Sequence, residues 1–236
     1  MSQVVAVAAE DFAVIASDGL VVDVQDGKLV PTGDQYCKFW TVNNGDIAMA
    51  STGSLGLNRE ISRFCVRVAE QHRDDLELFE VLVREVPAEL ERLKNQYPAA
   101  KERIHIEDGE PITLGGTNLL ITGYDASQQR IRSIYWGNCG NNACCQDKHD
   151  LTPHNCEGQI RAIGYGKDLV MDKLDVNDFD SPPDVVKLTE NVIRQAAEAF
   201  PKFVGGTIYS HVIMVPELKS MYEAAKDKTS VGHAVI

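Results

Sequence analysis

The residue with the clearest capacity for chemistry near the start of the chain is Ser2, which follows Met1 and precedes an apolar run. A serine hydroxyl is a weak nucleophile at neutral pH and needs a base within hydrogen-bonding distance. Once Met1 is removed, the free α-amine of Ser2 is such a base, because the pKa of this group in peptides is about 7.7–8.0. We expect this removal, since a small second residue such as serine favours it. A chain end of this kind could carry out acyl transfer.

A second concentration of reactive side chains is the segment 138–157, which holds four of the six cysteines and two histidines: Cys139, Cys144, Cys145, His149, His154 and Cys156. Cysteine and histidine can form a tetrahedral zinc site. However, the paired C-x2-C spacing of such sites is missing here. We therefore predict no metal and expect a disulfide or free thiols, with structural zinc as the alternative. The nearby acidic run, with Asp172, Asp175, Asp178 and Asp180, is predicted to be a solvated helix end.

The elements that must position these groups follow from hydrophobic periodicity. Residues 4–9 and 12–17 are β-prone runs around an acidic pair and predict a hairpin. The remaining expected strands cover residues 38–42, 46–51, 118–123, 130–136 and 158–164, with a late strand within 205–215. Amphipathic spacing predicts helices over residues 61–68, 76–93, 167–174 and 184–200, and turns are expected at 26–27 and 31–33. Two stacked sheets with outer helices or a plain α+β domain with one sheet would both satisfy this order.

A joint spacing of residues distinguishes these architectures. Counted from Ser2 as the first residue, Asp18 is the seventeenth and lies in "IASDG", Lys38 opens the strand in "YCKFWTV", and Gly53 follows fifteen residues later in "IAMASTGS". In this spacing, and in the order of "LLITGYD", "AIGYGKD" and "VGGTIYSHVIMV", the chain resembles the proteasome β-subunit family of N-terminal nucleophile (Ntn) hydrolases. The bacterial branch, HslV, is the most similar. The resemblance implies an α+β fold, a four-layer αββα sandwich of two antiparallel sheets, over a single domain of residues 1–236. The Cys/His-rich segment is then an insertion at about 138–157.

The resemblance also implies catalytic roles. Ser2 stands where the family has its N-terminal threonine nucleophile, Asp18 at its buried aspartate and Lys38 at its catalytic lysine. Gly53 stands at the glycine whose N–H forms the oxyanion hole. The Lys38 ammonium would stabilise the developing alkoxide and disfavour protonation of the amine, while the aspartate fixes the lysine. No cofactor is implied.

By the same count, five residues fall near the substrate pocket of the family: Val21, Tyr36, Trp40, Ser51 and Leu55. The implied substrates are peptides or unfolded proteins. The implied partners are copies of the chain itself, in stacked rings of six or seven subunits, and an unfoldase ATPase. Serine in place of threonine leaves an N-terminal-serine amidase on small amides as an alternative. If Met1 is retained, the alternative is an inactive ring-forming scaffold.

Composition and charge argue against several classes of partner and location. The formal net charge of −12 disfavours binding to nucleic acids or anionic membranes, which requires basic residues against phosphate. The sequence contains no apolar run of about 18 residues, so no membrane span is predicted. The first residues include Glu10, Asp11 and Asp18 and lack the basic region of a secretory signal. Together with six cysteines and no signal, this predicts a cytoplasmic protein.

Overall fold

Strands from both ends of the chain form a four-stranded sheet around the N-terminal hairpin. The computed structural model describes residues 3–25, 28–52, 55–96, 103–104, 112–113, 118–136, 154–155, 160–164 and 181–230. The strand order is β12-β1-β2-β13, and all pairs are antiparallel. The bounds are β1 (Gln3–Ala8), β2 (Phe12–Ser17), β12 (Ile160–Gly164) and β13 (Tyr209–Met214). The hairpin predicted from the two apolar runs is confirmed.

A five-stranded antiparallel sheet is built from the middle of the chain. Its order is β11-β10-β9-β6-β5. The bounds are β5 (Phe39–Val42), β6 (Ile47–Ser51), β9 (Leu119–Asp125), β10 (Arg130–Trp136) and β11 (His154–Asn155). Between β5 and β6 lies the 3-10 turn η1 (Asn43–Gly45). The prediction of a mixed α+β fold with antiparallel strands is confirmed.

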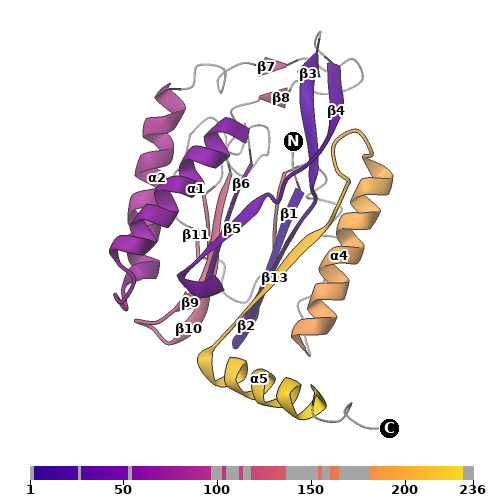
Figure 1. Cartoon of the computed structure of the whole chain (residues 1–236). Coiled ribbons are helices and arrows are strands. Elements are labelled where there is room, and N and C mark those ends of the chain that lie inside the picture. The colour runs from indigo at the N-terminus through magenta and orange to yellow at the C-terminus, as the bar shows by residue number, and fades with distance from the viewer. Residues whose placement is uncertain are drawn as a thin grey trace.

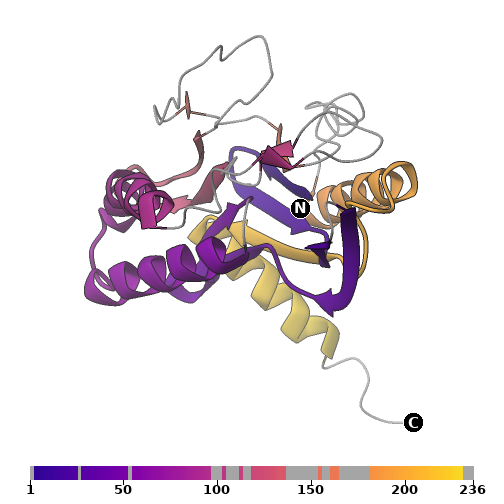
Figure 2. The same cartoon turned by 90° about the horizontal axis from the view of Figure 1, so that it is seen from above.

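Helices cover one face of each sheet (Figure 1). A buried apolar cluster joins α1 (Leu55–Gln71) and α2 (Leu78–Gln96) to the five-stranded sheet. A second cluster joins α4 (Pro182–Ala199) to the four-stranded sheet through residues such as Val5 and Val14. Seen from above, α1 and α2 lie on one side of the strands and α4 on the other (Figure 2).

The opposite faces of the two sheets share a third cluster of buried side chains. Because side chains alternate along a strand, Val4, Ala6 and Ala8 of β1 point away from the α4 side. They join Ala48 of β6 and Leu120 of β9 from the five-stranded sheet. Much of this contact is made by alanine, so the backbones of the two sheets can approach closely where alanines meet.

Two short antiparallel ribbons complete the strands. The hairpin of β3 (Leu20–Gln25) and β4 (Lys28–Gln35) follows directly after β2, and β7 (Arg103–Ile104) pairs with β8 (Ile112–Thr113). The turn predicted at 31–33 is wrong, because these residues lie within β4 and Pro31 pairs with Val22. Proline is tolerated on the edge of a two-stranded ribbon, and Gly33 adopts a φ of 84° there.

A C-terminal helix, α5 (Pro216–Ser230), is present where the sequence pattern predicted none. Lys219 Nζ lies 2.9 Å from Asp46 Oδ1 and joins this helix to the start of β6. The pairing of Met214 with Phe12, and of Tyr209 with Ser17, sets α5 at the end of the sheet opposite to Ser17 (Figure 1). The helix predicted at 167–174 lies outside the described residues. In the described part of the chain, no helix combines the length and apolar character that crossing a membrane requires.

The shared face of the sheets gives a stability prediction. Ala48 is completely buried there, and its cross-strand neighbour Thr41 is exposed on β5. We expect Ala48→Leu to lower the free energy of unfolding by about 1–3 kcal/mol, because the added atoms have no free volume. Urea denaturation would measure this change. The control Thr41→Leu should cost much less, and equal losses in both variants would contradict this packing.

Candidate active site

The carboxylate of Asp18 is the centre of the site. It follows β2 directly, is fully buried and accepts three backbone hydrogen bonds. Oδ1 accepts from Gln3 N at 2.7 Å, and Oδ2 accepts from Leu20 N at 3.2 Å and from Gly205 N at 3.3 Å. Asp18 N in turn donates to Gln3 O at 3.2 Å. The carboxylate is therefore tied to the first described residue of β1, to the start of β3 and to the loop before β13.

Lys38 supplies the opposite charge. Its side chain is only 5% exposed, and Nζ lies 3.8 Å from Asp18 Oδ1 and donates to Leu20 O at 2.6 Å. Lys38 N lies 3.3 Å from Ser17 Oγ, to which it donates. The segment between β4 and β5 thus crosses the end of β2 and sets the lysine beside the aspartate. The structure brings these two predicted residues together.

Burial shifts the pKa of both groups toward their neutral forms. Burial raises the pKa of Asp18 above its usual 3.8, while the Lys38 charge and the backbone N–H groups act in the opposite direction. Burial likewise lowers the pKa of Lys38 below its usual 10.5, against the attraction of Asp18. A buried lysine with a lowered pKa releases a proton more readily than a solvated one. Groups with such shifts are frequent in active sites.

Glycine at position 19 allows the strands to close around this pair. A Cβ atom on Gly19 would lie 2.8 Å from Thr207 O and 2.7 Å from Gln35 Oε1. Gly19 N donates to Gly205 O at 3.1 Å, and Tyr36 N donates to Gly19 O at 2.9 Å. A larger residue would force these backbone segments apart, so the "DG" pair has a packing role as well as an electrostatic one.

The junction from β6 to α1 is fixed by a buried asparagine that sequence reasoning missed. Asn58, 3% exposed, donates through Nδ2 to Ser51 O at 3.0 Å, and Ser51 Oγ donates to Asn58 Oδ1 at 2.6 Å. Thr52 N donates to Asn118 O at 3.0 Å. These bonds anchor both sides of the connection that contains Gly53. Gly53 itself lies outside the described residues, and so does Ser2.

The five predicted pocket residues are distributed unevenly. Tyr36 and Val21 are half-buried at the base of the β3–β4 hairpin, and Leu55 is half-buried at the start of α1. Trp40 instead packs against the cluster under α1 and α2. Ser51 is fully buried, with its hydroxyl engaged by Asn58.

Other side chains near Lys38 were not singled out from the sequence. The Cys37 thiol lies 3.2 Å from Phe39 O, and burial raises its pKa. Arg59 of α1 lies over the Tyr36 ring, with its guanidinium carbon 5.8 Å from the ring centroid. The sequence alone gives no signal for either contact. The first depends on how the backbone turns between Cys37 and Phe39, and the second joins two segments that only the fold brings together.

Metal binding finds no support among the described residues, where no group of three His, Cys, Asp or Glu side chains is gathered. Within the Cys/His-rich segment, His154 belongs to β11, whereas Cys139, Cys144, Cys145, His149 and Cys156 lie outside the described residues. Asp172, Asp175, Asp178 and Asp180 lie outside them as well. The choice between thiols, disulfide and zinc stays a prediction.

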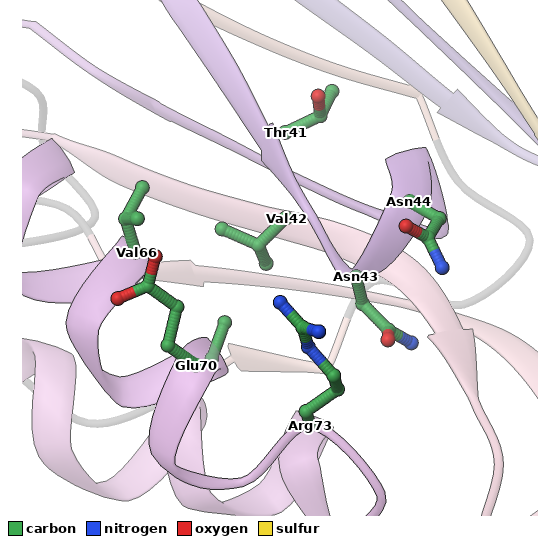
Figure 3. A pocket seen from close by; sticks show the side chains of 8 residues that line it. Thr41, Val42, Asn43, Asn44, Val66, Glu70 and Arg73 are labelled. Atoms are coloured by element: carbon green, nitrogen blue, oxygen red, sulfur yellow. The ribbon is translucent and has the colours of Figure 1, made fainter.

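A separate hollow lies at the other end of β5. Figure 3 shows the side chains around it, which come from the end of β5, η1 and the last part of α1 and the residues after it. Its lining residues are Thr41, Val42, Asn43, Asn44, Val66, Ala69, Glu70 and Arg73. None of the predicted site residues lines it. The hollow is thus distinct from the Asp18–Lys38 pair.

Comparison of the chain with protein-family models and with curated proteins found no match.

Removing the lysine gives a stability prediction with a defined pH dependence. Lys38→Met leaves the Asp18 carboxylate buried without its counter-charge, so we expect a loss of about 3–5 kcal/mol at about pH 8. The same change raises the pKa of Asp18 further. The folded variant then holds more protons than the unfolded chain above pH 3.8, and its stability rises as the pH falls. The deficit relative to the parent should therefore shrink at about pH 5, as measured by denaturant unfolding.

The matched control is Lys38→Met combined with Asp18→Asn, which has no carboxylate at this position. Its deficit relative to the parent should vary little between these pH values. A Lys38→Met deficit that is equal at both pH values would contradict the coupling.

The junction gives a second stability prediction. Asn58→Leu removes both partners of Ser51 and leaves a buried carbonyl and hydroxyl without hydrogen bonds, which costs about 1–3 kcal/mol. Thermal or urea unfolding would measure the loss. Ser62→Ala, which removes an exposed bond to Arg59 O on the same helix, is the control and should change stability little.

Proposed function

We propose that the protein is an N-terminal-serine hydrolase of proteasome-like type, which cleaves peptide bonds with Ser2 after removal of Met1. One observation carries this proposal: Gln3 N donates to the carboxylate of a buried Asp18–Lys38 pair. Residue 2 is bonded covalently to that same Gln3 nitrogen. The backbone nitrogen that follows residue 2 is therefore hydrogen-bonded to the carboxylate that pairs with Lys38, the only buried lysine among the described residues.

In the proposed mechanism the Ser2 hydroxyl attacks the substrate carbonyl carbon while its proton passes to the α-amine of Ser2. The Lys38 ammonium stabilises the developing oxygen charge, and the Gly53 N–H binds the oxyanion. When the C–N bond breaks, the α-amine returns the proton to the leaving nitrogen. Water, deprotonated by the same amine, then hydrolyses the ester on Ser2. Asp18 holds Lys38 in position throughout.

The wider proposal concerns architecture and partners. We propose that the three apolar clusters hold a four-layer αββα sandwich of the Ntn type within a single domain. Copies of the chain then assemble into stacked rings of six or seven subunits that enclose the site. Peptides or unfolded proteins, delivered by an unfoldase ATPase in the cytoplasm, are the substrates. The cluster shared by the two sheets, and the helices on their outer faces, support the sandwich.

The decisive experiment combines intact mass with hydrolysis. We expect the purified protein to have the mass of the chain without Met1 and to hydrolyse peptide aminocoumarin amides. Ser2→Ala should lower the rate by about 10³-fold or more, because it removes the nucleophile. Ser2→Thr, which keeps the hydroxyl, should retain activity. Circular dichroism of each variant would show that the fold is preserved.

The alternative functions give different outcomes. A mass that includes Met1 would contradict the enzyme and favour the scaffold. Loss of Met1 with cleavage of small acyl amides, and none of peptides, would favour the amidase.

A further inference from the structure

Strand β13 is one of the two outer strands of the four-stranded sheet (Figure 1). It pairs with β2 along its whole length, from Tyr209 opposite Ser17 to Met214 opposite Phe12, without a shift in register. No other described strand pairs with it. An outer strand of this kind carries a row of backbone N–H and C=O groups that its own sheet does not use.

The hydrogen bonds to β2 show which residues of β13 carry these groups. Val215 N donates to Asp11 O at 2.9 Å, so this pair lies at a hydrogen-bonded position of the ladder. Hydrogen-bonded and non-hydrogen-bonded pairs alternate along antiparallel strands, so every second residue from Ile213 back to Tyr209 also bonds to β2. The residues between them direct their N–H and C=O groups away from the sheet, and no described residue bonds to those groups. They are Ser210, Val212 and Met214.

The sequence of β13 lacks the features that commonly protect an edge strand. Its six residues include no lysine and no proline, and its pairing with β2 contains no bulge. The opposite edge strand of the same sheet, β12, carries Arg161. The edge strands of the five-stranded sheet, β5 and β11, have only four and two residues. Among the described strands of these two sheets, β13 is therefore the longest unprotected edge.

Charge does not oppose a second copy of the chain at this edge, although each copy has a net charge of −12. The strand itself contains no aspartate, glutamate, lysine or arginine. Glu190 of α4, which contacts the strand, accepts a hydrogen bond from Ser210 Oγ at 3.0 Å and lies 3.2 Å from Arg194. The charge of this glutamate is thus compensated within its own chain.

We propose that two copies of the chain associate by antiparallel pairing of their β13 strands about a two-fold axis at Val212. Val212 then lies opposite Val212 of the second copy, and Ser210 lies opposite Met214 of the second copy. Each outward N–H group meets an outward C=O group, so the two four-stranded sheets become one continuous sheet. The same surface is used by both copies, so the contact closes at two. It does not depend on the function proposed above.

A second copy suits this edge better than a free extended peptide. Either could add a strand to the sheet. However, a free peptide loses backbone entropy for each residue that it orders, whereas β13 is already held extended by β2. Val212 opposite Val212 also makes a β-branched cross-strand pair, which is favourable in sheets.

Hydrogen exchange of the strand amides, followed by NMR at low and high protein concentration, tests the pairing. The amides of His211 and Ile213 bond to β2 within one copy and should be protected at both concentrations. The amides of Ser210, Val212 and Met214 should gain at least about 10-fold protection as the concentration rises. Equal exchange of these three amides at both concentrations would overturn the pairing. Protection that arises only when unfolded casein is added would assign the edge to a peptide and overturn it as well.

Sedimentation velocity tests the association with matched variants. The parent should show a reversible monomer–dimer equilibrium. Val212→Pro should raise its dissociation constant at least about 10-fold, because the proline removes one outward N–H from each copy and none that bonds to β2. Val212→Ala trims the same side chain but keeps the N–H, so it is the control and should keep the parental dissociation constant.

A second proline variant guards against misfolding of the first. Ser210→Pro also removes an outward N–H, at an exposed position, and Ser210→Ala is its control. Circular dichroism melting would show which variants keep the fold. A parent that is monomeric at every concentration, or a folded proline variant with the parental dissociation constant, contradicts the proposed dimer.

Discussion

The burial of the Asp18–Lys38 pair is the constraint on which the surrounding structure depends. Two opposite charges removed from water are tolerated only when hydrogen bonds complete their shells. Here Gln3, Leu20 and Gly205 supply those bonds from three separate segments of the chain. The β1–β2 hairpin, the start of β3 and the loop before β13 must therefore meet at one point. The Asp18 carboxylate thus holds together the start of β1, the start of β3 and the loop before β13.

The same constraint explains the local sequence around the pair. Gly19 is required because Thr207 O approaches too closely for a side chain. Lys38 reaches Asp18 because the chain crosses the end of β2 between β4 and β5, where Lys38 N donates to Ser17 Oγ. The opposing shifts in pKa are the cost of placing this pair in the interior, and they leave Lys38 closer to neutrality than a surface lysine. Removal of the pair from water thus explains both why the hydrogen bonds around Asp18 are needed and why the pKa values of the two groups shift.

Sequence patterns predicted the elements whose apolar residues form continuous or periodic runs, and missed features that depend on tertiary contacts. The runs around Val5 and Val14 identified β1 and β2, because both faces of these strands are buried. The turn expected at Pro31 was wrong, since an edge ribbon accepts proline. Helix α5 escaped detection because it carries few apolar residues and is attached by Lys219 to Asp46. Asp18 and Lys38 were selected by spacing, whereas Asn58 was missed because its role depends on the buried contact with Ser51 that the β6–α1 junction creates.

The anchoring of Gln3 has a practical consequence for handling the protein. The first described strand begins at the Asp18 carboxylate, whereas α5 lies at the far end of the same sheet. An affinity tag fused before residue 1 would be joined to the chain within a few bonds of the buried charges and would compete for that space. Helix α5 leads away from the end of the sheet that is opposite to Asp18, so a tag on that side is not joined to the strand that begins at the carboxylate. The choice of terminus for purification therefore decides which form of the molecule is studied.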